Sequence, residues 1–213
     1  MSRFDVDYSL YLVTDSTLCG SRGVPETARL AVAGGATVVQ VREKSASTPE
    51  FIALAKAVKT AIAGTRARLI INDNLDVALA VEADGVHIGQ SDTPYPEARR
   101  IMGPEAIIGL SVETMDQIAQ ASAWDVDYLG VSPVFETPTK TDTAPAWGLD
   151  GLRRLRSATP VALVGIGGIG PLNAADVIRA GADGVAVVSA ICATPDPEAA
   201  ARSLFAQVRS ARI

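Results

Sequence analysis

Three polar side chains at alternate positions indicate an anion-binding strand. Gln40, Arg42 and Lys44 lie in the segment QVREK, and because side chains alternate across a strand, all three point to the same side. Arginine and lysine inside a protein are costly unless they meet an anion. A guanidinium offers phosphate a two-pronged hydrogen bond, and a lysine adds a compact charge. We therefore interpret the segment as a phosphate site, the alternative being an ion pair with Asp15 or Glu43.

Two aspartates predict a magnesium site. Asp73 in IINDN and Asp92 in GQSD each follow an apolar run. Mg²⁺ is commonly bound by one or two carboxylates together with the phosphate oxygens of a substrate, so this pair beside Arg42 and Lys44 suits a magnesium–diphosphate complex. Each aspartate taken alone could instead cap the helix that follows it. We favour metal binding because the two occur as a pair on neighbouring strands.

Glycine-rich and small residues near the end of the chain form a candidate site for a second phosphate. Residues 164–170 read VGIGGIG, and residues 187–191 read VVSAI. Glycines let the backbone approach an anion closely, and a helix that follows offers its free amide groups. Such glycines are common in turns, so the weight of the pattern comes from its place after the last two apolar runs.

A hydroxyl-rich segment, residues 134–148, interrupts these runs. Its sequence, VFETPTKTDTAPAWG, is too polar and too broken by proline to form the interior of a strand or a helix. The hydroxyls of Thr137 and Thr139 and the ammonium of Lys140 match the oxygens of a diphosphate. We expect this loop to close over that group, and a solvated surface loop is the alternative.

The residues named so far share one place relative to the expected elements. Short apolar runs alternate with stretches that carry apolar residues three and four apart, such as residues 26–36, 49–64 and 172–182. Several of these helical stretches end in glycine, which suits the left-handed residue after a helix. The apolar runs cover residues 10–15, 37–43, 68–73, 85–90, 107–112, 127–134, 161–168 and 184–191.

This alternation of strands and helices predicts parallel strands covered on both faces. Eight such units in 213 residues favour a single-domain α/β fold, a closed (β/α)8 TIM barrel over residues 1–213, rather than an open doubly wound sheet. Active sites of such barrels lie at the C-terminal ends of the strands. The polar residues described above follow the apolar runs, and the strand starts carry almost nothing comparable. We therefore expect one pocket.

Composition narrows the classes of protein. The formal net charge of −5 offers no basic stripe to nucleic acid, although local cations could still hold a small anionic ligand. No apolar run approaches the roughly 18 residues of a membrane-spanning helix, and we expect neither a membrane partner nor a signal peptide. The cytoplasm is the expected location, and the sequence leaves a homo-oligomer open.

Five other residues receive less specific interpretations. His87 is the single histidine and lies within an apolar run, where a hydrogen-bonded core or wall residue is favoured over a general base. Cys19 and Cys192 are too few for a disulfide framework, and we interpret them as small apolar residues or free thiols. Tyr128 and Trp147 are interpreted as packing residues.

Six ordered motifs of the chain resemble the thiamine phosphate synthase family. They are QVREK, IINDN, GVHIGQSD, GLSVET, GVSPVFETPTKTD, and VGIGGIG followed by AGADGVAVVSAI, and they span nearly the whole chain. The resemblance implies a (β/α)8 barrel that couples hydroxymethylpyrimidine diphosphate to thiazole phosphate, releasing diphosphate and forming thiamine phosphate. It also implies magnesium as the cofactor and these two small molecules as the partners.

The resemblance further implies roles for individual residues. Asp73 and Asp92 would hold Mg²⁺. The pyrimidine substrate and its diphosphate would contact Gln40, Arg42, Lys44, Asn72, Thr137, Thr139 and Lys140, with Ser111 near the pyrimidine. The thiazole phosphate would be held by Gly168, Val188 and Ser189. The residues expected to take part in catalysis are Arg42, Lys44, Ser111 and Lys140.

One residue departs from the pattern of the wider superfamily. Glu113 in GLSVET stands where a histidine often occurs, and the thiazole tautomerase branch is expected to use that histidine. The departure counts against a tautomerase-like isomerase that acts on a monophosphate alone. A catalytically silent phosphate-binding barrel is the second alternative, and the paired aspartates with the basic residues argue against it.

The implied reaction depends on charge stabilisation more than on proton transfer. A 4-aminopyrimidine can stabilise positive charge on its exocyclic methylene, so the bond to the diphosphate can break first. The protein would then neutralise the departing diphosphate with magnesium, arginine and lysine, and thiazole nitrogen would attack the cation. No dedicated general base is required, in agreement with a single histidine in the chain.

Replacement of Lys140 with alanine tests this interpretation. If the lysine neutralises the departing diphosphate, Lys140→Ala should lower the rate of the chemical step more than it weakens binding of the pyrimidine substrate. Single-turnover kinetics separates the two quantities. A variant that keeps the wild-type single-turnover rate would contradict the prediction.

Overall fold

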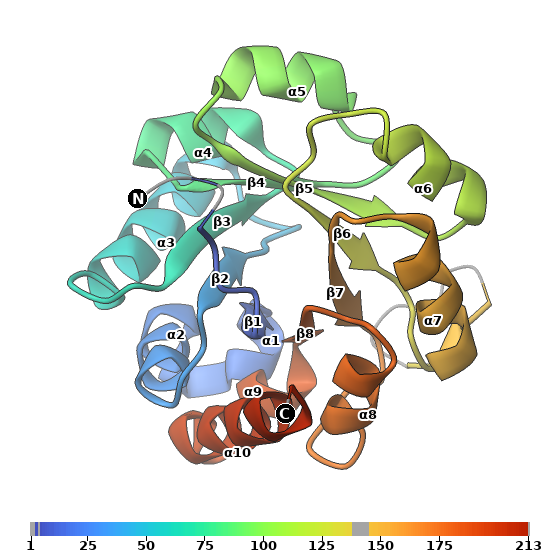
Figure 1. Ribbon diagram of the computed structural model, residues 1–213. Helices are drawn as coiled ribbons and strands as arrows, with labels where there is room; N and C mark the ends of the chain where they lie inside the picture. The colour runs from blue at the N-terminus through green and yellow to red at the C-terminus, as the bar shows by residue number, and fades with distance from the viewer. Residues whose placement is uncertain (1–2, 4, 138–144, 213) are drawn as a thin grey trace.

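Parallel strands close into a barrel in the computed structural model of the protein (Figure 1). The structure describes residue 3, residues 5–137 and residues 145–212. Each strand pairs with the next along the chain, and the last pairs with the first. The strands are β1 Leu10–Val13, β2 Val38–Val41, β3 Arg68–Asn72, β4 Gly85–Ile88, β5 Ile107–Val112, β6 Tyr128–Val131, β7 Ala162–Ile166 and β8 Gly184–Val187.

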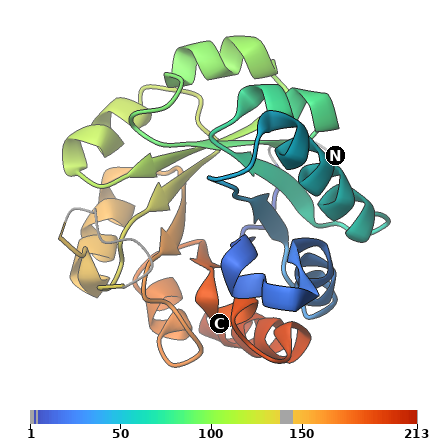
Figure 2. The same cartoon turned by 180° about the vertical axis from the view of Figure 1, so that it is seen from behind.

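Helices follow the strands and surround the barrel, as Figure 1 and Figure 2 show from opposite sides. They are α1 Ser16–Cys19, the short 3₁₀ helix η1 Gly20–Arg22, α2 Val24–Ala33, α3 Thr48–Ala61, α4 Leu75–Val81, α5 Tyr95–Met102, α6 Met115–Ala121, α7 Gly148–Ala158, α8 Ala174–Arg179, α9 Ser189–Cys192 and α10 Pro197–Ala211. The predicted single-domain α/β barrel is confirmed. In the described part of the chain, no helix has the length and apolarity to cross a membrane.

The predicted boundaries differ from the observed ones mainly at the polar ends of the strands. β2 ends at Val41 and β4 at Ile88, whereas the sequence patterns extended to residues 43 and 90. The hydrogen-bonded pairing of the strands stops where charged residues or a glycine follow, so the polar residues at these positions lie in loops. The helix ends agree better with expectation, because Gly35 and Gly181 take the left-handed φ values of 112° and 107°.

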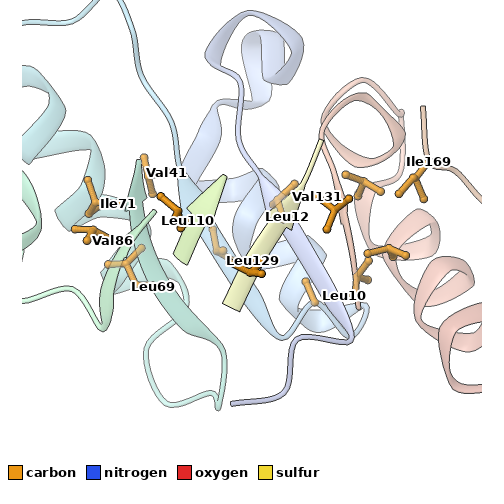
Figure 3. Close-up of a cluster of buried hydrophobic side chains, with 14 of the residues drawn as sticks. Leu10, Leu12, Val41, Leu69, Ile71, Val86, Leu110, Leu129, Val131 and Ile169 are labelled. Atoms are coloured by element: carbon orange, nitrogen blue, oxygen red, sulfur yellow. The ribbon is translucent and has the colours of Figure 1, made fainter. Parts of the chain in front are cut away.

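Two apolar layers hold the barrel together. The larger layer lies between the strands and the helices and includes Leu12 and Val131 (Figure 3). The smaller layer fills the barrel itself and includes Tyr11, Ile70 and Val164. Because side chains alternate along a strand, Tyr11 faces the interior while Leu12 faces the helices. Each large side chain fully buried in this way contributes on the order of 1.5–3 kcal/mol.

Three aspartates join the strand starts at the opposite end from the polar loops. Asp84, Asp127 and Asp183 stand directly before β4, β6 and β8. Each carboxylate accepts a 2.8 Å hydrogen bond from a backbone amide of the preceding strand. The donating amides are those of Leu69, Ile108 and Leu163, in the same order. The same three aspartates also form ion pairs with Arg68, Arg99 and Arg156, at 2.8, 2.7 and 2.8 Å respectively. The expectation that strand starts carry little polar chemistry is therefore wrong, since they carry a structural set of ion pairs.

Gly109 makes room for a tyrosine inside the barrel. A Cβ atom at this position of β5 would lie 2.0 Å from Cζ of Tyr128, far inside van der Waals contact. Tyr128 is 1% exposed and hydrogen-bonded through its hydroxyl, so it has little freedom to move aside. At this level of the barrel interior, the large side chain of Tyr128 fills the space that Gly109 leaves empty.

Substitution of Gly109 with alanine should destabilise the fold. The added methyl group would overpack the barrel, at a cost of about 1–3 kcal/mol in the free energy of unfolding. Gly170→Ala is the matched control, because a Cβ there meets nothing within 4 Å. Urea denaturation of both variants measures the difference, and equal midpoints for the two would contradict the packing argument.

Candidate active site

A cavity of about 890 Å³ opens at the C-terminal ends of the strands. Every strand of the barrel contributes at least one residue to its wall. The predicted site residues that line it are Gln40, Arg42, Lys44, Asn72, Asp73, Asp92, Ser111, Thr137, Gly168, Val188 and Ser189. Thr139 and Lys140 lie outside the described residues. The structure thus brings together, in one cavity, all the predicted site residues that it describes.

The two aspartates lie side by side. Burial and then a hydrogen bond shared with Asp92 raise the pKa of the Asp73 carboxyl to about 6. Asp73 has a left-handed φ of 62°, uncommon for a residue with a side chain, and its amide donates to the carbonyl of His87 at 2.8 Å. Asp92 accepts a 2.7 Å hydrogen bond from the Gly89 amide. The backbone thus orients both carboxyl groups toward one point.

Neither aspartate caps the helix that follows it. The N-cap of α4 is Asn74, whose side chain accepts a 2.9 Å hydrogen bond from the Val77 amide. The N-cap of α5 is Pro94, and no side chain caps that helix. The capping alternative is therefore wrong for both carboxylates. Within the described residues no group of three or more His, Cys, Asp or Glu side chains could hold a metal ion, so a cation here would need oxygens from a ligand or water.

Arg42 and Lys44 form a basic wall next to these aspartates. Both contribute favourable charge interactions to Asp73, and Arg42 is half-buried while Lys44 is exposed. The acidic side chains that the sequence offered as alternative partners are engaged elsewhere. Asp15 caps α1 through a 2.9 Å bond from the Leu18 amide, and Glu43 accepts a 2.6 Å bond from the Ser16 hydroxyl. The basic wall therefore faces the cavity, where its charge interacts with Asp73 rather than with Asp15 or Glu43.

A glycine turn after β7 forms the other side of the cavity. Gly168 has a φ of 65°, and a Cβ on it would lie 2.8 Å from the backbone oxygen of Glu136, so only glycine fits. Asn173 holds the turn closed: its amide nitrogen donates to the Gly168 carbonyl at 2.9 Å, and its oxygen accepts from the Gly170 amide at 2.8 Å. Exposed Ser189 begins α9 on the neighbouring strand end. The turn and Ser189 leave space for a second anion.

His87 forms part of the cavity wall. Its Nδ1 lies 2.9 Å from the Tyr128 hydroxyl and its Nε2 lies 2.8 Å from the Ser111 hydroxyl. Burial lowers the pKa of His87 to about 4, because the charged imidazolium would lose its hydration. A neutral, doubly hydrogen-bonded wall residue agrees with the interpretation from sequence.

Some cavity residues were not expected from the sequence. Tyr11 lines the cavity, and Tyr128 does so in addition to packing in the barrel. Gln117 also lines the cavity. Gln90, a polar residue expected at the C-terminal end of its strand, donates to the Ser111 carbonyl at 2.6 Å. The available signal was the alternation along each strand: Tyr11 faces inward with Val13, just as Gln40 does with Val38. Tyr11 and Tyr128 lie within apolar runs, where an aromatic side chain is more often a packing residue.

The remaining interpretations concern buried thiols and one tryptophan. Cys19 and Cys192 are free and buried, as expected. Trp147 is half-buried and packs against the core at the start of α7, also as expected. Its indole nitrogen is buried and has no hydrogen-bond partner among the described residues. These residues take no part in the cavity wall that the structure describes.

A closed barrel with a polar cavity at the C-terminal ends of the strands has the architecture of a (β/α)8 enzyme that acts on small molecules. Comparison with known proteins narrows the class. Residues 10–191 match the thiamine monophosphate synthase family, and the chain belongs to that family. The resemblance expected from the six sequence motifs is therefore confirmed.

The similar proteins cover nearly the whole chain. A thiamine-phosphate synthase of Albidiferax ferrireducens is 55% identical over 195 residues, which is 92% of this chain and 89% of the relative. One from Moorella thermoacetica is 49% identical over 205 residues, covering 96% and 98%. A solved structure of thiamine phosphate pyrophosphorylase from Pyrococcus furiosus is 36% identical and superposes with a TM-score of 0.89 over 98% of each chain.

The depressed pKa of His87 predicts a pH dependence of stability. In the unfolded chain the histidine binds a proton below a pKa of about 6.5, whereas the folded protein resists that proton until the pH nears 4. The contribution of His87 to stability is therefore fully present when the pH is above its pKa in the unfolded chain, and it is lost as the pH falls toward 4. Between pH 7.5 and 4.5, wild type should lose about 2 kcal/mol relative to His87→Gln, which lacks the titrating group.

Chemical denaturation of both proteins across this pH range checks the prediction. Taking the difference between wild type and variant removes contributions from other titrating groups that the two share. A difference in the free energy of unfolding that does not change with pH would show that His87 accepts a proton as readily when folded as when unfolded.

Proposed function

We propose that this chain is a thiamine-phosphate synthase that transfers the hydroxymethylpyrimidine group from its diphosphate to thiazole phosphate, with release of diphosphate. The observation that supports the proposal is that one cavity contains two different groups of residues suited to bind anions. The carboxylate pair and the basic wall lie on one side, and the glycine turn with Ser189 lies on the other. Such a cavity suits one reactant with a diphosphate and another with a monophosphate.

Mg²⁺ is the proposed cofactor, held by Asp73 and Asp92 together with diphosphate oxygens. The fit rests on the donor set: two carboxylates, one with its pKa raised to about 6 by burial and by its neighbour, lose their mutual repulsion when a cation lies between them. Hard oxygen ligands suit magnesium. When bound, the ion would offset negative charge on the diphosphate.

The basic wall stabilises the leaving group in the proposed reaction. The bond between the exocyclic methylene carbon and the diphosphate oxygen breaks, and its electron pair leaves with the diphosphate. Arg42 and Lys44 bind this oxygen charge more strongly as it develops. The lone pair of the thiazole nitrogen then forms the new carbon–nitrogen bond. Lys140 and Thr139 are proposed to add contacts with the diphosphate, and Thr137 lies at the cavity wall.

The remaining site residues orient the reactants. Gln40, Asn72 and Ser111 would contact the pyrimidine, since their polar groups line the inner part of the cavity. Gly168, Val188 and Ser189 would hold the thiazole phosphate, whose oxygens can accept hydrogen bonds from backbone amides. No residue is needed as a general base, and His87, whose pKa is lowered to about 4, is neutral at physiological pH.

The alternatives from the wider superfamily fit this cavity less well. A tautomerase-like isomerase acting on a monophosphate has no use for the paired carboxylates or the basic wall. A silent binding barrel has no need to hold Asp73 in a left-handed backbone conformation. We further propose that the protein works in the cytoplasm on these small-molecule substrates without nucleic acid or a membrane.

An assay of diphosphate release tests the proposed function and its metal. With both substrates present, wild type should release diphosphate in the presence of Mg²⁺, and removal of the ion with a chelator should abolish release. Asp73→Asn should lower kcat/KM by about 100-fold or more, because one of the two carboxylates is lost. Asp116→Asn, on an exposed aspartate in the first turn of α6, is the matched control and should keep full activity.

The outcomes separate the alternatives. Turnover that persists without a divalent ion, or an unchanged Asp73→Asn variant, would reject the metal part of the proposal. Failure of wild type to release diphosphate under any condition would reject the synthase itself and favour an isomerase or a binding barrel.

A further inference from the structure

An unbroken chain of hydrogen bonds crosses the floor of the cavity. Gln40 Nε2 donates to the Tyr11 hydroxyl at 2.8 Å, which lies 2.7 Å from the Tyr128 hydroxyl. Tyr128 lies 2.9 Å from Nδ1 of His87, and Nε2 of His87 lies 2.8 Å from the Ser111 hydroxyl. The chain therefore begins and ends at polar side chains of the cavity wall and runs between them inside the barrel.

The three central residues are neutral, and the two tyrosines are shielded from water. Tyr11 and Tyr128 are each 1% exposed, and burial raises the pKa of both hydroxyls while it lowers that of His87. In the described part of the chain, neither hydroxyl has a hydrogen-bond partner outside this set. Each hydrogen bond of the chain therefore contains one proton. Which of its two atoms donates determines which atom donates in the next hydrogen bond.

The amide of Gln40 sets that direction. Because Nε2 can only donate, the Tyr11 oxygen accepts from it and must donate its own proton to Tyr128. Tyr128 then donates to Nδ1 of His87, which leaves the single imidazole proton on Nε2. That proton is donated to the Ser111 oxygen, so the Ser111 hydroxyl proton is free to point into the cavity. At the other end, Oε1 of Gln40 is left to accept.

We infer that Tyr11, Tyr128 and His87 are positioning residues that fix Gln40 as an acceptor and Ser111 as a donor toward the ligand, and so select an aminopyrimidine over its 4-oxo counterpart. The identity of the ligand rests on the proposed function. The direction of the chain rests on the hydrogen bonds alone.

The two ligands present opposite hydrogen-bonding patterns. A 4-aminopyrimidine offers an amino group that donates and ring nitrogens that accept, which matches one acceptor and one donor on the protein. In the 4-oxo form the exocyclic oxygen accepts and the adjacent ring nitrogen carries a proton. Binding it on the same two residues would require the Gln40 amide to rotate and every proton in the chain to reverse. A buried mismatch of this kind costs far more than a missing apolar contact.

The tautomer of His87 tests the direction without any ligand. His87 is the single histidine of the chain, so ¹⁵N-labelled histidine gives one pair of ring-nitrogen resonances in the full-length protein. The expected result at neutral pH is a neutral ring with its proton on Nε2. A proton on Nδ1, or a charged ring, would overturn the inference whatever the activity of the protein.

Tyr128→Phe tests the coupling, with Tyr8→Phe as the matched control. Phenylalanine at 128 keeps the ring but removes the link between Tyr11 and His87. Tyr8 packs against Tyr128 with ring centroids 4.8 Å apart, and its buried hydroxyl has no partner among the described residues. Its replacement therefore disturbs the same barrel interior without cutting the chain.

Equilibrium binding of the two pyrimidine diphosphates supplies the second readout. The preference of wild type for the amino form should fall by about tenfold or more in Tyr128→Phe and stay unchanged in Tyr8→Phe, and the His87 resonances of Tyr128→Phe should show loss of the single tautomer. Equal preference in wild type and Tyr128→Phe would overturn the inference. If wild type binds neither compound, the proposed function and the ligand half of the inference both fail, while the tautomer still decides the direction of the chain.

Discussion

The close approach of two carboxyl groups constrains the whole cavity. Asp73 and Asp92 follow different strands, yet they share a hydrogen bond in a partly buried place, where ionising both is unfavourable. The fold maintains this arrangement through the backbone. Asp73 takes a left-handed conformation anchored on β4, and Asp92 is fixed by the amide of Gly89. The barrel thus holds two carboxyl groups close together, and under the proposed function a cation bound between them would stabilise both in the ionised form.

The same geometry would let the cavity hold the two proposed reactants at once. The basic residues after β2 and the carboxylates after β3 and β4 occupy neighbouring strand ends, while the glycine turn after β7 and Ser189 after β8 lie farther around the ring. Between them the floor is neutral and hydrogen-bonded. A positively charged pyrimidine intermediate would therefore meet no fixed cation beneath it, and the leaving group and the nucleophile would approach it from different parts of the wall.

The sequence predicted the parts of this design that follow from local pattern. Alternating apolar runs and helical periodicity were enough for the barrel, and polar residues after each run were enough for Arg42, Asp73 and Ser189. What it could not predict depends on contacts between distant segments. Tyr128 looked like a packing residue because its hydroxyl has a partner 117 positions away in the chain, Tyr11. Likewise, capping by Asp92 could be rejected only once the structure showed that its carboxyl meets Asp73 rather than the first turn of α5.

The aspartate–arginine pairs at the strand starts separate the stability of the barrel from the sequence of the loops around the cavity. Asp84, Asp127 and Asp183 tie alternate strands to their neighbours on the side away from the cavity. Strand register is therefore secured at the end of the barrel opposite the cavity, independently of the loops that surround the cavity. Those loops could be lengthened or exchanged to accept other small molecules while the barrel keeps its shape.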